Sequence, residues 1–105
     1  MQIQFYTDTN VTKSKDLIAW STSLISKELS RFSRQKTKVE VHLLDEESNN
    51  KGIHNKCCIV EAQLAGRKPI AVTDRANTHV QAIFGAIYKL KTSLENNNQT
   101  FNSLF

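Results

Sequence analysis

Apolar and polar residues alternate along four short stretches of the chain. These stretches are residues 2–7, 37–44, 56–64 and 69–73. Successive side chains of a β-strand point to opposite faces of a sheet, so each stretch predicts a strand with one buried face. In the first stretch, for example, Ile3 and Phe5 share the apolar side. The dipeptide Gly66-Arg67 separates the last two stretches and predicts a tight turn between them.

A longer stretch, from about Lys13 to Ser33, has the spacing of an amphipathic helix. Its apolar stripe consists of Leu17, Leu24, Ile25, Leu29 and Phe32. Apolar residues that recur three or four positions apart lie on one side of a helix, and that side packs against a core. Thr12 or Ser14 can cap the N-terminus, because their side-chain oxygens accept hydrogen bonds from backbone N–H groups of the first turn.

A second amphipathic helix is expected to begin between Asp74 and Thr78. Its apolar stripe is expected to contain Ala76, Val80, Ile83, Ile87, Leu90 and Leu94. Gly85 falls on the opposite side, where it lowers helix stability and can allow close approach of something outside the domain. The polar run at residues 96–99 is predicted to end the helix, which leaves residues 96–105 as a flexible tail.

The predicted order of elements is β-α-β-β-β-α. The first strand, the first helix and the second strand form a βαβ unit, and the last three strands follow as an antiparallel meander. Both apolar helix stripes must then cover one face of a four-stranded sheet, which gives a two-layer α+β domain. This order is similar to that of double-stranded RNA-binding domains. We therefore expect one domain over residues 1–95, followed by the tail.

Charge is moderately basic and unevenly distributed along the chain. The 105 residues carry a net charge of +4, and the isoelectric point is about 9.2. Residues 27–38 contain a single acid, Glu28, whereas acids gather at residues 45–47. The cations of that first segment are Lys27, Arg31, Arg34, Lys36 and Lys38. Such separation predicts a positive side suited to a phosphate backbone, although ordinary solvated charge would give the same pattern.

A basic stripe is expected beside the apolar stripe of the first helix. It consists of Lys13, Trp20, Lys27, Arg31 and Arg34, which lie within about 60° of one another on the helix. Its cations can follow phosphates, and an exposed tryptophan can stack on an unpaired base. Alternatively, Trp20 lies at the edge of the core, shielded by the aliphatic parts of the basic side chains.

Further cations follow on the second helix, in the turn at residues 66–68 and just before the second helix. The predicted RNA-binding residues are Trp20, Lys27, Arg31, Arg34, Lys36, Arg67, Lys68, Arg75, Lys89 and Lys91. Because the two helices are expected to lie side by side, we expect their cations to point outward together and to border one groove.

Catalytic and metal-binding patterns are weak in this sequence. Cys57 and Cys58 are adjacent, so they point to opposite faces of a strand and cannot easily form a disulfide. We expect reduced thiols, one of them in the core. Neither the cysteines nor the histidines, which are His42, His54 and His79, have the spacing of a zinc site or of a nucleophile with its base. We therefore expect no enzyme, no catalytic residue, no metal and no cofactor.

Nothing in the sequence indicates a membrane protein. No apolar run approaches the roughly 18 to 20 residues of a membrane span. The N-terminus lacks the basic and then apolar layout of a signal peptide. We expect a cytoplasmic protein with no membrane partner.

Residues 45–95 resemble one family. The run from Lys56 to Thr73, with Asp45-Glu46 and Lys51-Gly52 before it, looks like the central segment of single-domain ribosome hibernation-promoting and ribosome-associated inhibitor proteins, also called sigma-54 modulation proteins. The last helix of that family is similar to Ala76-Asn77-Thr78, Gln81-Ala82, Gly85-Ala86, Lys89-Leu90 and Leu94-Glu95. The family's fold has the same element order as the one predicted above.

This resemblance implies a bacterial protein of the stress response and stationary phase. It would bind the small ribosomal subunit through rRNA in the mRNA and tRNA channel, inhibit translation and preserve idle ribosomes without catalysis. Lys89 matches the family's basic positions, and Lys91 fits those that follow. Beyond Leu90 the family usually has more Lys and Arg, whereas this chain has Thr92 and the run at 96–98, which implies a weaker grip on RNA.

The expected partners are therefore the small ribosomal subunit and rRNA, with no small-molecule substrate, and a monomer when free. Two alternatives remain open. One is a binding module for another structured RNA, and the other is a protein-interaction or regulatory domain that acts without RNA.

Overall fold

Four strands form one mixed sheet in the order β1-β2-β3-β4, in which β1 and β2 are parallel and the other neighbours are antiparallel. The computed structural model describes residues 1–8, 14–32, 37–45 and 56–103, with side chains up to residue 96. The elements are β1 (Gln2–Thr7), α1 (Lys15–Glu28), the short 3-10 helix η1 (Ser30–Phe32), β2 (Thr37–Asp45), β3 (Lys56–Leu64), β4 (Ile70–Ala76) and α2 (His79–Ser103). This is the predicted β-α-β-β-β-α order, so the α+β fold class is confirmed.

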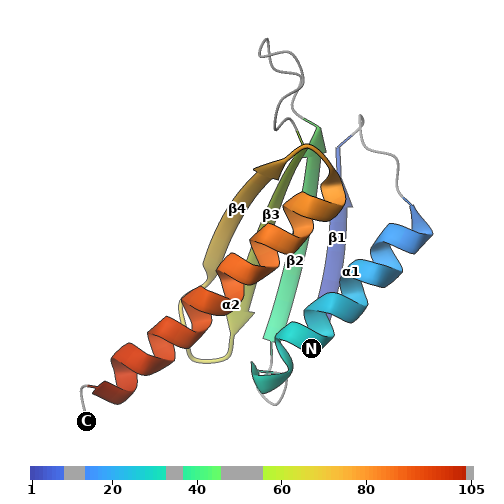
Figure 1. Ribbon diagram of the computed structural model, residues 1–105. Coiled ribbons are helices and arrows are strands. Elements are labelled where there is room, and N and C mark those ends of the chain that lie inside the picture. Colours follow the sequence, from blue (N-terminus) through green and yellow to red (C-terminus); the bar gives the residue numbers. More distant parts are fainter. Residues whose placement is uncertain (9–13, 33–36, 46–55, 104–105) are drawn as a thin grey trace.

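Both helices cover the same face of the sheet. In Figure 1, α1 lies beside β1 and α2 crosses the sheet over β3 and β4. The covered face of the central strands is fully buried at Val39, Val41 and Leu43 of β2 and at the β3 residues opposite them, Ala62, Val60 and Cys58. The helices complete this core with Ile25, Leu29, Ile83, Ala86, Ile87, Leu90 and Leu94. The other face is more polar, and on it the rings of Tyr6 and His42 stack with centroids 4.8 Å apart.

Ser14, one of the two predicted candidates, is the N-cap of α1. Its side-chain oxygen accepts a hydrogen bond from the backbone N–H of Leu17 at 3.2 Å. The helix ends at Glu28, earlier than predicted, and the chain continues as η1. The hydroxyl of Thr37, at the start of β2, donates to the carbonyl of Phe32 at 2.8 Å and holds the end of η1 against the sheet.

The second helix differs from the prediction at both ends. Residues Asp74–Ala76 belong to β4, and Thr78 caps a helix that begins at His79. The helix continues to Ser103, so the predicted end at residues 96–99 is wrong. Asparagine costs less than about 1 kcal/mol relative to alanine in a helix, and no Gly or Pro follows position 85 to stop it.

Two residues of α2 have surroundings that differ from those predicted. Val80, expected in the core, is 49% exposed. Gly85, expected to face outward, lies against β4, where a Cβ atom would overlap with the carboxylate of Asp74. That carboxylate forms an ion pair with Lys89, with Nζ and Oδ1 2.9 Å apart. Gly85 therefore makes room for a charged side chain of the same domain, not for an external partner.

This contact predicts an effect of Gly85→Ala that depends on residue 74. In the wild-type background, alanine should displace the Asp74 carboxylate from Lys89 and lower the free energy of unfolding by about 1 kcal/mol, in spite of its better helix propensity. In an Asp74→Ala background the same substitution should stabilise the protein by about 1 kcal/mol. Urea unfolding of the four variants measures both values. The same sign in both backgrounds would contradict this explanation.

Candidate nucleic-acid interface

The topology brings cations from several elements to one end of the sheet. β1 and β2 begin at this end, α1 and η1 finish there, and the turn between β3 and β4 lies there because β3 runs antiparallel to β2. The cations at this end, which we call the basic end, are Lys27, Arg31, Lys38, Arg67 and Lys68. They come from four different parts of the fold, and the topology brings them to the same end of the sheet.

Lys38 lies centrally in the basic end, although the sequence did not single it out as an RNA-binding residue. It pairs with Gln2 of β1 on one side and with Gln63 of β3 on the other. Together with Arg67 and Lys68 it lines an open hollow of about 620 Å³ beside the β3–β4 turn. None of the described residues that line the hollow is acidic. A phosphate group in this hollow would therefore meet three cations and no carboxylate among the described lining residues.

The turn itself has a defined backbone. Gly66 has a φ of +79°, a left-handed conformation that glycine adopts without strain. The backbone N–H of Arg67 donates to the carbonyl of Leu64 at 3.1 Å, which closes the predicted tight turn. The turn thus holds Arg67 and Lys68 at a fixed place beside Lys38.

Acidic residues gather at the opposite end of the sheet. β1 and β2 finish there, and both helices begin there. The carboxylates at this end belong to Asp8, Asp16, Asp45 and Asp74. One of them, Asp45, forms an ion pair with Lys56 in which Nζ and Oδ2 are 2.6 Å apart. Lys15, Lys56 and Arg75 lie at this end as well, so the two ends differ in their balance of charge but do not separate cations from carboxylates completely.

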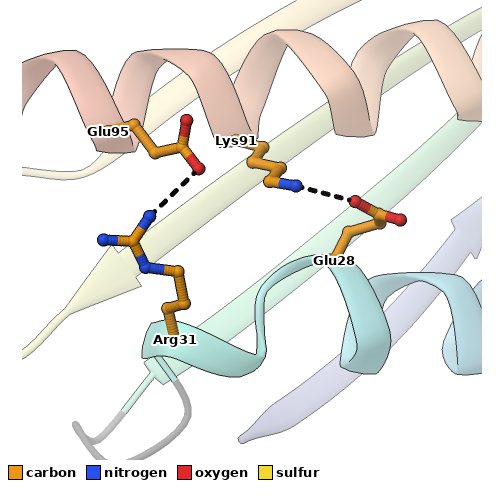
Figure 2. Close-up of polar contacts among 4 residues, drawn as sticks. All are labelled: Glu28, Arg31, Lys91 and Glu95. Atoms are coloured by element: carbon orange, nitrogen blue, oxygen red, sulfur yellow. Dashed lines mark hydrogen bonds and ion pairs between the residues drawn. The ribbon is translucent and has the colours of Figure 1, made fainter.

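The cations of the helices are mostly paired with carboxylates. Two ion pairs connect α2 to the preceding helices, as Figure 2 shows. Arg31 of η1 pairs with Glu95 at 3.4 Å, and Glu28 of α1 pairs with Lys91 at 3.1 Å. The third, Lys89 with Asp74, lies on the β4 side of α2. Exposed pairs of this kind are weak, so these cations can still change partners. Their carboxylates nevertheless reduce the positive potential over the helices.

The expected groove of helix cations is therefore only partly present. Arg31 and Lys91 face the gap between the helices, but Lys89 faces β4, and its Nζ also donates to the carbonyl of Thr73 at 2.9 Å. Arg75 is exposed at the opposite end of the sheet from Arg67 and Lys68. Arg34 and Lys36 lie outside the described residues. Lys27 is exposed, as expected for a nucleic-acid contact.

Aromatic side chains occupy the outer surface between the helices. Phe84 is 58% exposed and Tyr88 is 66% exposed, and Val80 precedes them on the same side of α2. On α1, Trp20 is 38% exposed. Phe84 and Tyr88 were not predicted as site residues, although they follow Val80 at intervals of four, which places all three on one side of the helix.

Neither cysteine has the environment of a reactive thiol. Both are free and buried, and Cys58 belongs to the core cluster. Burial, followed by the nearby Cys57 and Asp74, raises the pKa of Cys58 to about 12. The thiolate, which is the reactive form, is therefore nearly absent at neutral pH.

The described part of the chain contains no group of three His, Cys, Asp or Glu side chains arranged to hold a metal ion. Among its helices, none is both long and apolar enough to cross a membrane.

Comparison with known proteins reveals similarity of structure but not of sequence. The sequence matches no model of a known protein family and no curated protein. The N-terminal domain of protein Y from Thermus thermophilus superposes with a TM-score of 0.73 and 15% identity, over 91% of this chain and 98% of that domain. A ribosomal subunit interface protein from Coxiella burnetii superposes with a TM-score of 0.68 and 20% identity, over 94% of this chain and 99% of the other. This chain therefore has the fold of these two proteins over nearly its whole length.

Proposed function

We propose that this protein binds the small ribosomal subunit through rRNA in the mRNA and tRNA channel, inhibits translation and preserves idle ribosomes. It acts as a cytoplasmic, bacterial hibernation factor of the stress response and stationary phase, and it is a monomer when free. The observation that carries this proposal is the basic end, at which cations from α1, η1, β2 and the β3–β4 turn lie together.

Two further observations support the ribosome as the target. One of the proteins with this fold is described as a ribosomal subunit interface protein. The resemblance to the hibernation family expected from residues 45–95 agrees with this fold, although no family model matches the sequence. A generic RNA-binding module would explain the cations but neither of these likenesses.

The mechanism needs no chemistry from the protein. Each phosphate that a lysine or arginine neutralises releases bound counterions, which favours association at low salt. A folded domain held in the channel by such contacts excludes mRNA and tRNA by its volume. RNA binding is thus expected to centre on the basic end, with Lys38, Arg67 and Lys68 on one side of it and Lys27 and Arg31 on the other.

Co-sedimentation with purified ribosomal subunits tests this proposal. The protein should pellet with small subunits at about 50 mM salt and dissociate progressively as the salt concentration rises, because its contacts are ionic. It should pellet much less with large subunits. An excess of a generic RNA duplex should displace it poorly.

Equal pelleting with both subunits, or full displacement by the duplex, would instead favour a module for other structured RNA. Absence from every ribosomal fraction at low salt would refute the proposal.

A further inference from the structure

A narrow slot lies between the two helices on the outer surface of the domain. Its described lining consists of Leu24 and Glu28 from α1 and Phe84, Ile87 and Tyr88 from α2. Ile87 belongs to the core, so it forms the floor of the slot, whereas the exposed rings of Phe84 and Tyr88 form one wall. The volume is about 60 Å³.

The dimensions of the slot suit a single flat group. An amphipathic partner helix would insert apolar side chains at several successive turns, and a slot of this volume accepts only one small or planar group. Aromatic walls are also the surfaces on which nucleobases stack, because every base has a π face. The shape therefore favours a base over a protein segment.

The charges around the slot suit a nucleotide as well. Glu28 lines the slot, and its Oε2 pairs with Nζ of Lys91 at 3.1 Å. A carboxylate repels a phosphate, but it can accept a hydrogen bond from the amino group of a base. Outside the slot, Lys27 is exposed on the turn of α1 that carries Glu28, and Arg31 follows on η1. Both cations lie near the C-terminal end of α1, where they can take phosphates of the strand that carries the bound base.

We propose that the slot between α1 and α2 binds an unstacked nucleobase of single-stranded RNA, stacked against Phe84 and Tyr88. This inference rests on the proposed binding to rRNA and adds a base-reading contact to the ionic ones. Trp20, which is exposed, lies one turn before Leu24 on the same side of α1.

An abasic oligonucleotide separates this contact from ionic binding. Fluorescence anisotropy should be measured with a short single-stranded RNA of mixed sequence and with an abasic strand of the same length and charge. The wild-type protein should bind the base-containing strand about 10-fold or more tightly, since one stacked base is worth about that factor. Emission from Trp20, the single tryptophan of the chain, should be quenched by the first strand and not by the second.

The variant Phe84→Ala/Tyr88→Ala should lose this preference and bind both strands with the affinity of the wild type for the abasic strand. Its salt dependence should not change, because no charge is altered. The variant Tyr88→Phe, which keeps the ring, should behave as the wild type, and so should Val80→Ala, which lies outside the slot. The exposure of all three positions means that the thermal unfolding midpoint should change little.

Three results would overturn the slot as a base site. The first is equal affinity of the wild type for both strands. The second is a double alanine variant that still prefers the base-containing strand. The third is a double alanine variant that no longer binds small ribosomal subunits but binds single-stranded RNA normally. The last would assign the aromatic rings to a protein of the subunit. A chain that prefers bases yet ignores ribosomal subunits would keep the slot and refute the proposed function.

Discussion

Replacement of Leu90 by alanine is expected to lower the free energy of unfolding by about 3 to 4 kcal/mol. Leu90 is fully buried in the middle of α2, among core residues of the helix and the sheet. Removal of a buried leucine side chain costs the transfer free energy of its methyl and methylene groups plus the free energy of the cavity left behind. Domains of this size are stabilised by only about 5 to 15 kcal/mol, so the substitution removes a large share.

Phe84→Ala is the matched control on the same helix. More than half of the Phe84 side chain is exposed, so its removal should change the free energy of unfolding by about 0.5 kcal/mol or less. Urea unfolding followed by circular dichroism measures both variants. Similar losses at Leu90 and Phe84 would mean that α2 does not pack on the sheet with the side described above.

Charge reversal at the basic end is expected to give the largest effect on RNA binding. Lys38→Glu/Lys68→Glu should weaken binding to the small subunit about 100-fold at 50 mM salt, since each lost phosphate contact costs about one order of magnitude there. The slope of log affinity against log salt should become shallower by about 1.4 to 1.8. Both residues are exposed, so the fold should tolerate the change.

Lys15→Glu/Arg75→Glu provides the control with the same change in net charge. Both residues are exposed, but they lie at the end of the sheet opposite the basic end. The affinity for the small subunit should fall only a few-fold, because the two added carboxylates lower the positive potential of the whole molecule. The slope of log affinity against log salt should barely change. An equal loss in the two double variants would show that total charge, and not the basic end, controls binding.

The sequence was sufficient to predict the order of the elements and the bounds of β1 and β3. The strand predicted at 56–64 is found as Lys56–Leu64, because its unbroken apolar row of Cys58, Val60, Ala62 and Leu64 favours one register, in which that row faces the core. Ser14 was recognisable as a cap because it precedes the first apolar residues of α1. Where apolar residues were periodic, they predicted the two layers of the domain correctly.

Periodicity could not identify which part of a broad apolar stripe is covered. Val80 and Ile87, seven residues apart, lie on the same side of α2, yet the first is exposed and the second is buried beside α1. The same limit explains the misplaced Gly85, because its contact with Asp74 joins a helix to an edge strand. The end of a helix is also hard to predict where the residues have intermediate helix propensity and no Gly or Pro follows. The continuation of α2 to Ser103 illustrates this.

The candidate site was predicted by charge, but charges pair across the fold. The partners of Arg31 and Lys91 are 64 and 63 residues away in the sequence, so no local pattern could have shown them. A signal for Lys38 did exist. The predicted order of strands already placed the start of the second strand beside the turn after the third, and hence beside Arg67 and Lys68.

The different balance of charge at the two ends of the sheet also bears on the rate of association. An excess of cations at one end gives a molecule a dipole moment, and the field of a polyanion would turn such a molecule during approach so that Lys38, Arg67 and Lys68 arrive first. Orientation before contact raises the proportion of productive encounters, and it weakens as salt shortens the range of the field. The topology places the starts of β1 and β2 beside the end of α1, and thereby brings the cations to one end. It thus influences the rate at which the protein associates with RNA as well as its affinity.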